Sequence, residues 1–325
     1  MARILDGSDP HAIDAAAAAL RAGEVVAFPT ETVYGLGADA LNERAVAQVF
    51  AVKNRPRFDP LIVHLPDKAT VLQYAAVVDA RAVALMERFW PGPLTLVLRK
   101  RPLIPDLVTA GLDTVALRVP AHPVALALLR AVGRPIAAPS ANPFGYVSPT
   151  TALHVREMLG DAIGLILDGG PCTVGIESTV CALTETDAVV LRPGGVTVEE
   201  IEAVIGPVAV AASSQADPRS PGTLPRHYSP HVPLTLLAPG ESLPSPGKGQ
   251  RVGLLTLTPR ADVEGYVVVE ALSKDGNLLE AAANLFAALR RLDGLGLERV
   301  VIEPMPERGI GRAIMDRLRR AAARD

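Results

Sequence analysis

Residues 28–40, FPTETVYGLGADA, join a strand-like run to two closely spaced glycines through a short segment rich in polar groups. That segment supplies three hydroxyl groups and one carboxylate, from Thr30, Thr32, Tyr34 and Glu31. The run that precedes it, EVVAF at 24–28, has the composition of a buried β-strand. A cluster of polar side chains directly after a buried strand is unusual. Whether these side chains form a binding site depends on which other parts of the chain lie next to them.

Further strand-like runs alternate with helical patterns upstream of residue 206. They occur at 61–65 (LIVHL), 94–98 (LTLVL), 114–119 (TVALRV), 135–138 (PIAA) and 164–168 (GLILD). This alternation predicts a large α/β domain over residues 1–206. The chain contains no GxxxxGK(S/T), GxGxxG or GxSxG motif, so a nucleotide site would have to be assembled from side chains and separate loops.

Residues 206–233 contain six prolines and four serines, a composition that excludes a helix or a central strand. We therefore expect a linker at 207–231 and a second unit at 232–325. In that unit two strand-like runs, RVGLLTL and YVVVEAL, precede a helical pattern at 277–292 that begins with the capping residue Asn277. The second unit is thus predicted to be a small α/β domain with a Rossmann-like arrangement.

Composition limits the classes of function. The 325 residues are 49% hydrophobic and 21% charged, with a net charge of −3, which argues against a protein that mainly coats nucleic acid. No apolar run approaches the ~20 residues of a membrane span, and Asp6 and Asp9 interrupt the N-terminal segment, so we expect a cytoplasmic protein with no membrane partner. Cys172 and Cys181 are interpreted as core residues.

A cationic cluster follows the predicted helix that starts near Glu43. Lys53, Arg55 and Arg57 lie within five residues. Cations at the end of a helix often do no more than complement its dipole. Lys53, however, continues the apolar face formed by Val46, Val49 and Phe50, and an inward lysine needs an anionic partner. Asp59 is the nearby acid, and a bound phosphate would serve equally.

Three later loops are also rich in polar and turn-forming residues. They are APSANPFGYVSPT at 138–150, GIESTV at 175–180 and LRPGG at 191–195. The first of them follows a predicted strand, which is where open α/β sheets bind their ligands. His227 and His231 have the spacing of some zinc sites, but no third ligand is near, so zinc is not expected.

These stretches together resemble the YrdC-like domain of the L-threonylcarbamoyl-AMP synthase family over residues 10–200. The resemblance is carried by PTETVYGLG, KNRP with PLIVH, WPGPLTLVL, GLDTVALRVPAHP, APSAN, GIESTV and LRPG, in that order. The segment RHYSP at 226–230, followed by a small α/β domain, resembles the long form of the family. The resemblance implies a twisted mixed sheet flanked by helices, followed by the small C-terminal domain.

The resemblance also implies an activity, that of a nucleotidyltransferase. L-threonine, bicarbonate or carbon dioxide, and ATP would be joined into threonylcarbamoyl-adenylate with release of pyrophosphate. The product would pass to the tRNA threonylcarbamoyl transfer machinery for t6A37 modification. No protein nucleophile or organic cofactor is implied, Lys53 and Arg55 would stabilise charge, and Mg²⁺ would be held by the nucleotide phosphates rather than by the protein.

The family's binding residues carry over to matching positions here. L-threonine would be bound by Thr32, His64, Arg118, Ala138 and Ser178. ATP would be bound by Lys53, Arg55, Asp59, Thr114, Ser140, Asn142, Ser148, Arg192 and Tyr228. Gly35 and Gly37 would let the chain turn closely around the threonine. Asp59 stands where an amide is expected opposite a polyphosphate, and the linker is expected to close over ATP as a lid.

Two other classes of function remain open. One is a double-stranded RNA or tRNA binding module without synthase activity, since YrdC-like surfaces can be concave and basic; the acidic net charge speaks against it. The other is a carbamoyl-transfer domain of the hydrogenase-maturation type. That class would carry acylphosphatase and zinc-finger-like segments, and this sequence has neither.

Overall fold

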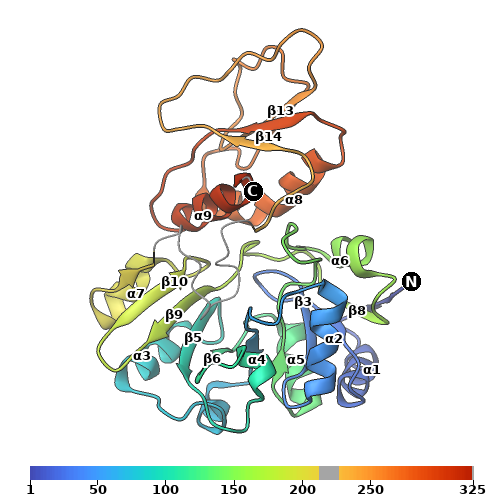
Figure 1. The fold of residues 1–325 in the computed structure, drawn as a ribbon, viewed down its shortest axis with the longest axis vertical. Coiled ribbons are helices and arrows are strands. Elements are labelled where there is room, and N and C mark those ends of the chain that lie inside the picture. Colours follow the sequence, from blue (N-terminus) through green and yellow to red (C-terminus); the bar gives the residue numbers. More distant parts are fainter. Residues whose placement is uncertain (212–226, 324–325) are drawn as a thin grey trace.

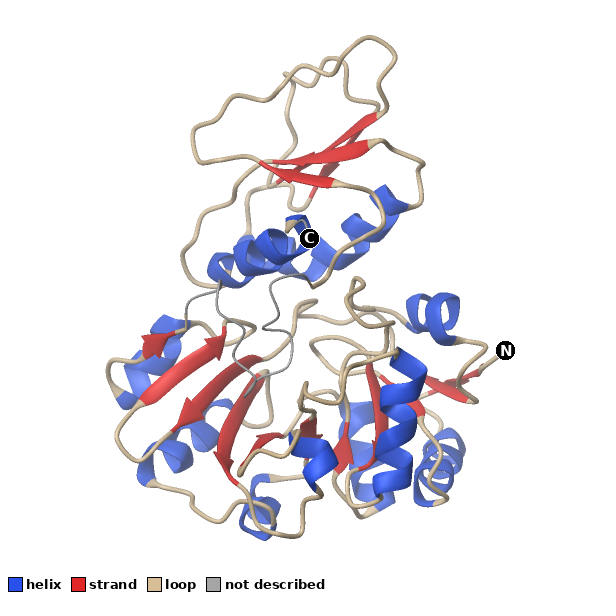
Figure 2. Ribbon diagram, viewed as in Figure 1, coloured by secondary structure: helices blue, strands red, loops and turns tan. Residues whose placement is uncertain are grey.

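The computed structural model describes residues 1–211 and 227–323, and these form two sheets with their helices (Figures 1 and 2). The large unit contains β1 (Arg3–Asp6), β2 (Val26–Phe28), β3 (Gly35–Asp39), β4 (Ile62–His64), β5 (Leu94–Arg99), β6 (Thr114–Arg118), β7 (Ile136–Ala137), β8 (Leu165–Asp168), β9 (Thr179–Leu183), β10 (Ala188–Arg192) and β11 (Ala209–Val210). Its helices are α1 (Pro10–Arg21), α2 (Glu43–Lys53), the 3-10 helix η1 (Lys68–Gln73), α3 (Ala80–Phe89), α4 (Asp106–Thr109), α5 (Pro123–Val132), α6 (Ala152–Leu159) and α7 (Val198–Ile205). The C-terminal unit contains β12 (Leu234–Leu236), β13 (Val252–Thr256), β14 (Val268–Ala271), α8 (Leu278–Asp293), β15 (Arg299–Ile302) and α9 (Gly311–Ala322).

The large sheet is mixed and has 11 strands in the order β1-β8-β2-β3-β7-β4-β6-β5-β9-β10-β11. The small sheet is wholly parallel, in the order β12-β15-β13-β14. The predicted α/β class and the Rossmann-like second unit are therefore confirmed. All six strands predicted in the first unit are present, and helix α8 begins after Asn277, whose side chain accepts hydrogen bonds from the backbone of Leu279 and Glu280.

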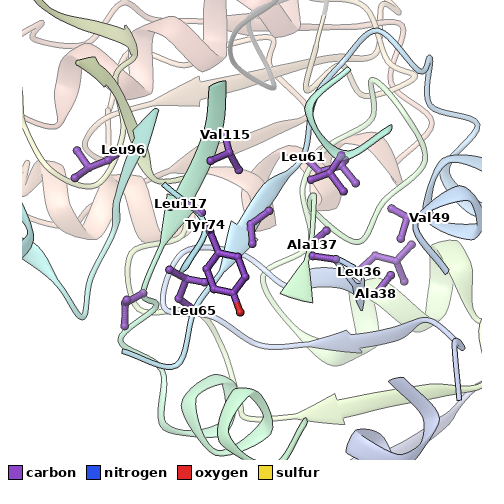
Figure 3. Packing of buried hydrophobic residues seen from close by; sticks show 14 of the residues in the cluster. Leu36, Ala38, Val49, Leu61, Leu65, Tyr74, Leu96, Val115, Leu117 and Ala137 are labelled. Carbon is purple, nitrogen blue, oxygen red and sulfur yellow. The ribbon is translucent and has the colours of Figure 1, made fainter. Parts of the chain in front are cut away.

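The two faces of the large sheet are covered by different helices because successive side chains of a strand point to opposite faces. On one face Ala27, Leu36 and Ala38 pack with Val49 of α2, as Figure 3 shows for three of them. On the other face Phe28 lies in the cluster formed with α1 and α5. The hydrophobic core thus extends on both sides of the strands that carry the candidate site.

Gly35 and Gly37 belong to strand β3 rather than to a turn, which corrects the expectation that they bend the chain around a ligand. A Cβ on Gly37 would lie 2.7 Å from Cε1 of Phe28 and 2.8 Å from Cγ2 of Ile136. The glycine is therefore required by close side-chain packing across the sheet. Gly35 forms an isolated bridge with Ser140, so the strand and the loop after β7 are adjacent.

The register of the central strands brings two polar residues side by side. Strands β4 and β6 are parallel and place His64 opposite Arg118. Strand β5 is parallel to β9, and the backbone N–H of Thr179 donates to the carbonyl of Pro93 at 2.9 Å. The loops after β2, β7 and β8 reach these residues, because Thr32, Ser140 and Ser178 line one cavity together with His64 and Arg118.

The C-terminal unit faces the large unit through its helices. Figure 1 shows α8 and α9 between the small sheet and the large unit. The hydrophobic cluster of the C-terminal unit also includes Val33, Val147 and Ile176 of the large unit. The two units therefore share one packed interface. No helix among residues 1–211 and 227–323 has the length and apolar character needed to cross a membrane.

Candidate active site

A small cavity of about 50 Å³ lies between the central strands of the large sheet and the loops that follow β2, β7 and β8. It is lined by Thr30, Thr32, Val33, Gly35, Arg55, Ile62, His64, Arg118, Ala138, Pro139, Ser140, Glu177, Ser178, Arg192, His227 and Tyr228. All five residues expected to bind threonine are among them. Four of the residues expected to bind ATP, namely Arg55, Ser140, Arg192 and Tyr228, are there as well.

Arg118 lies in the wall of the cavity at the end of β6. It is only 3% exposed, and its Nη2 is 2.7 Å from Oε1 of Glu31. Nη1 donates to the hydroxyl of Thr32 at 3.0 Å, and Nε donates to the carbonyl of Gly92 at 3.2 Å. Nη2 is thus held by a buried ion pair with Glu31. A ligand carboxylate at this position would compete with Glu31 for the guanidinium.

The hydroxyl groups of the PTETVYG segment have separate structural roles. Thr30 donates to the carbonyl of Val33 at 2.6 Å and contacts the hydroxyl of Thr32 at 2.8 Å, so it shapes the segment. Tyr34 points away from these residues and donates to the carbonyl of Gly170 at 2.7 Å. Thr32 is the hydroxyl that lines the cavity beside Arg118.

His64 is buried at the end of β4, in edge-to-face contact with Phe28. Burial, together with the positive charge of Arg118, lowers the pKa of His64 to about 3. The imidazole is therefore neutral at physiological pH. Its Nδ1 has no hydrogen-bond partner within the described residues, so the ring can still bond a ligand.

Lys53 is 1% exposed, which confirms that it faces inward from α2. In the structure Lys53 is bonded not to the nearby Asp59 but to two backbone carbonyls: Nζ donates to Ser140 at 2.6 Å and also to Asn142. Within the described residues it forms no ion pair with a carboxylate. Burial, assisted by the charge of Arg55, lowers the pKa of Lys53 well below its usual value. A buried ammonium without an anion is costly, so this position favours an anionic ligand.

Asp59 pairs instead with Arg55. Arg55 Nη2 lies 2.9 Å from Asp59 Oδ2, and both side chains are buried. Arg55 also donates to the carbonyls of Asp59 and Pro60, at 3.2 and 2.9 Å. The aspartate therefore orients the arginine that lines the cavity, which accounts for an acid where an amide was expected. A direct contact of Asp59 with ATP stays a prediction.

The loop after β7 is held by its own polar side chains. Asn142 Nδ2 donates to the carbonyls of Pro143 and Tyr146, at 2.8 and 2.9 Å. Ser148 donates to Oε1 of Glu177 at 2.6 Å. Asn142 and Ser148 thus adjoin the cavity without lining it. Thr114 begins β6, at the opposite end of that strand from Arg118, and does not line the cavity.

Tyr228 forms part of the cavity wall from the start of the C-terminal unit. It is buried, has a left-handed backbone with φ of +62°, and stacks on Phe286 with ring centroids 5.6 Å apart. Its hydroxyl has no hydrogen-bond partner within the described residues. The lid predicted for the linker concerns mainly residues 212–226, which lie outside the described residues, so closure over ATP stays a prediction.

The two linker histidines do not converge. His227 is buried in the cavity wall, whereas His231 is exposed and its Nδ1 is 2.9 Å from Oδ2 of Asp293. The described part of the chain contains no group of three His, Cys, Asp or Glu residues placed to hold a metal ion. Cys172 and Cys181 are buried free thiols, which confirms their assignment to the core.

The chain matches two family models over most of its length. The Sua5/YciO/YrdC model, described as telomere recombination, matches residues 18–194, and the model of the threonylcarbamoyl-AMP synthase C-terminal domain matches residues 196–323. The chain belongs to the threonylcarbamoyl-AMP synthase family. It has the long form of that family, with the additional C-terminal domain.

Relatives of this synthase-family chain cover both units. A threonylcarbamoyl-AMP synthase of Bacillus subtilis (strain 168) is 45% identical over 98% of this chain and 94% of its own length. The crystal structure of P. abyssi Sua5 complexed with L-threonine has a TM-score of 0.88 and 41% identity, covering 97% of this chain and 95% of that one. A second P. abyssi Sua5 structure, of a double-alanine variant, has a TM-score of 0.90 and 39% identity over 99% of this chain and 96% of that one.

The sequence did not predict a role in the site for several residues that lie in or beside it. Glu31 and Glu177 lie inside quoted motifs, and a carboxylate in an apolar segment is a signal that it has a buried partner. Arg317 of α9 was missed entirely, although it is fully buried and its Nε donates to Glu177 at 2.8 Å. It continues the apolar face of Ile310 and Ile314, the same pattern that identified Lys53.

Proposed function

We propose that the protein is a nucleotidyltransferase that makes L-threonylcarbamoyl-adenylate from L-threonine, bicarbonate or carbon dioxide, and ATP. The observation that carries the proposal is the buried guanidinium of Arg118, which lines a cavity together with neutral His64 and Ser178. A guanidinium in this state is suited to bind the carboxylate of an amino acid. The threonine-bound relative supports the same assignment.

The nucleotide would lie on the side of the cavity toward Arg55, Ser140 and Tyr228. Lys53 supports this placement, since its buried ammonium has only carbonyl partners within the described residues and would gain an anion from the phosphates. In the proposed reaction the threonine amine takes up carbon dioxide as a carbamate. A carbamate oxygen then attacks the α-phosphorus, and the bond to the leaving pyrophosphate breaks. Lys53 and Arg55 would stabilise the negative charge that develops on the phosphates.

Magnesium, if required, would be carried by the nucleotide. Each carboxylate at or beside the cavity is already paired with a guanidinium: Glu31 with Arg118, Asp59 with Arg55, and Glu177 with Arg317. These residues are therefore poorly suited to replace the water ligands of Mg²⁺. The ion would neutralise phosphate charge, and the residues of the chain would bind and orient the substrates around it.

The alternative of an RNA-binding module receives no support from the cavity. Its cations, Arg55, Arg118 and Arg192, and the neighbouring Lys53 are all less than 10% exposed. Buried cations cannot contact the phosphates of a duplex, whose binding depends on accessible lysine and arginine. The geometry is suited to a small anionic substrate. The product would then serve the t6A37 modification of tRNA.

The proposal is tested by measuring pyrophosphate release with all three substrates and with each one omitted. Release is expected only when threonine, bicarbonate and ATP are present together. Release that does not depend on threonine would contradict the proposed reaction, and binding of duplex RNA in about 200 mM salt without any pyrophosphate release would favour the RNA-binding alternative.

A further inference from the structure

The loop at residues 174–178, between β8 and β9, touches the cavity on one side and the C-terminal unit on the other. Glu177 and Ser178 line the cavity, while Ile176 packs in the hydrophobic cluster of the C-terminal unit. Gly175, with φ of +73°, lies directly against α8, where an added Cβ would be 2.4 Å from Cα of Ala283. The position of the loop therefore depends on the C-terminal unit as much as on its own strands.

The charged contact to this loop comes from α9. Arg317 is fully buried; its Nε donates to Oε2 of Glu177 at 2.8 Å, and its Nη1 donates to Oδ2 of Asp316 at 2.6 Å. Asp316 in turn accepts from Nε of Arg320 at 3.0 Å. The guanidinium of Arg317 also lies over the ring of Tyr228, 5.1 Å from its centroid. One side chain of the C-terminal unit thus contacts two residues of the cavity wall.

Glu177 transmits this contact to other residues of the site. Its second oxygen accepts the hydroxyl of Ser148, and the next residue, Ser178, is hydrogen-bonded to Thr95 at 2.8 Å. Burial alone would raise the pKa of Glu177, but the guanidinium groups of Arg317 and Arg192 lower it, so this carboxylate stays ionised. The ionised carboxylate of Glu177 accepts a hydrogen bond from Ser148 and another from Arg317. These two bonds fix the position of the loop at residues 174–178.

We propose that Arg317 is a positioning residue for the substrate cavity, which holds Glu177 and Tyr228 in place from the C-terminal unit. The proposal rests on the proposed function, because it assigns Ser178 and Tyr228 to the binding of threonine and ATP. It gives the C-terminal unit a specific role, since α9 would hold two residues of the cavity wall in place without lining the cavity itself. Arg317 does not line the cavity and acts only through these two residues.

The test compares Arg317→Lys with the matched control Arg319→Met, on the same helix. Arg319 is partly exposed and pairs with Glu307, away from the cavity. Lysine keeps the positive charge but cannot bond Glu177 and Asp316 as a planar fork. We expect kcat/KM for threonine-dependent pyrophosphate release to fall about 10- to 100-fold in Arg317→Lys, because a small displacement of substrate-binding groups slows a reaction by about this much. The melting temperature should change little. Arg319→Met should match the wild type.

A second variant separates positioning from folding. Arg317→Met alone leaves the carboxylate of Glu177 buried without its partner and can fail to fold, whereas Arg317→Met with Glu177→Gln removes both charges together. The double variant is expected to melt near the wild-type temperature and still lose activity at least as strongly as Arg317→Lys. Wild-type kinetics in a stable double variant or in Arg317→Lys would overturn the proposal.

Amide hydrogen exchange supplies a readout that does not depend on catalysis. In the absence of substrates, exchange at residues 174–180 and 227–231 should be faster in Arg317→Lys than in the wild type and the control. If the wild type released no pyrophosphate but this difference appeared, the proposed function would fall and the role of Arg317 in holding the loop would stand. Unchanged exchange in the variant would overturn that role whether or not the enzyme is active.

Discussion

Lys53 is a buried cation whose hydrogen bonds, within the described residues, go only to carbonyl oxygens. In the Lys53→Met variant we expect a fold at least as stable as the wild type, because a buried ammonium without an anion is removed. ATP binding should weaken about 10- to 150-fold, which corresponds to the roughly 1.5 to 3 kcal/mol of a charge-assisted hydrogen bond. ATP titration and thermal unfolding check both parts. The control is the variant Lys68→Met, at an exposed position. Normal ATP affinity in Lys53→Met would mean that Lys53 does not bind ATP and only complements the dipole at the end of helix α2.

Arg118 is the residue proposed to bind the threonine carboxylate. Arg118→Ala should weaken threonine binding by about 2 to 5 kcal/mol, the cost of removing one partner of a desolvated charge pair. Glu31→Gln should act in the opposite direction, since it removes the carboxylate that competes for the same guanidinium. Calorimetric titration with threonine measures both effects, with the exposed Arg99→Ala on the neighbouring strand as control. Equal affinity in all variants would exclude Arg118 from the site.

The buried neutral state of His64 predicts a dependence of stability on pH. Its pKa is about 3 in the folded protein and 6.5 in the unfolded chain. The unfolded chain therefore binds the extra proton first. Stability from this residue is complete above about pH 6.5 and falls by about 1.4 kcal/mol per pH unit as the pH decreases toward about 3. Denaturant unfolding of wild type and His64→Gln between pH 7 and 5 should show a shallower loss in the variant; parallel curves would contradict the assignment.

At the scale of elements, strand β3 depends on the absence of a side chain at Gly37. In Gly37→Ala the new Cβ would meet Phe28 and Ile136 at less than 3 Å. Overpacking of this kind costs about 1 to 3 kcal/mol of unfolding free energy. Gly164→Ala is a matched control, because nothing lies within 4 Å of that position and its backbone is not left-handed. Urea unfolding should show a lower midpoint for Gly37→Ala alone, and Phe28→Leu in the same chain should recover part of the loss.

The elements themselves were predictable because their signals are local. Period-two and period-3.6 patterns located the six strands and the helix after Asn277, and the apolar face of α2 showed that Lys53 points inward. The partners of the buried charges were not predictable in the same way. Glu31 meets Arg118, and Arg317 meets Glu177, only because strand order and the packing of α9 bring distant segments together. Such pairs are set by topology, so a linear pattern identifies the charge but not its partner.

The strand position of Gly35 and Gly37 illustrates the same limit. Two glycines in a motif are as typical of a turn as of close packing in a strand. Which of the two applies here depends on Phe28, which lies on the adjacent strand and is not next to the glycines in the sequence. Tyr228 is a second case. The proline-rich context placed it in a linker, but did not indicate that its ring is buried against Phe286 and Arg317.

At the scale of the whole molecule, Asp293 joins the two units. Its side chain accepts hydrogen bonds from the hydroxyl of Tyr146 at 2.6 Å and from the backbone N–H of Val232 at 2.8 Å. Asp293→Ala should lower the unfolding free energy by about 1 to 3 kcal/mol, since buried donors lose their acceptor. Hydrogen exchange should rise around Tyr146 and at the end of α8, and stay slow in the central strands.

The control for this interface is Asp275→Ala, an exposed aspartate elsewhere in the C-terminal unit. It should leave both the unfolding free energy and the exchange pattern unchanged. Equal exchange in Asp293→Ala and Asp275→Ala would mean that the units are held together by the shared hydrophobic cluster around Val33, Val147 and Ile176 alone.

The pairing of Glu31 with Arg118 has a consequence for selectivity among small anions. A carboxylate fixed by the fold competes for the guanidinium at an effective concentration well above that of free ions in the surrounding solution. Acetate, lactate and inorganic phosphate each bring one anionic group and few other contacts, so they gain little by displacing it. In the proposed site, a molecule that also presents an amine and a hydroxyl would recover the loss through Ser178, His64 and Thr32. On this proposal, Glu31 would compete with small anions for Arg118 and would thereby disfavour the binding of common metabolites.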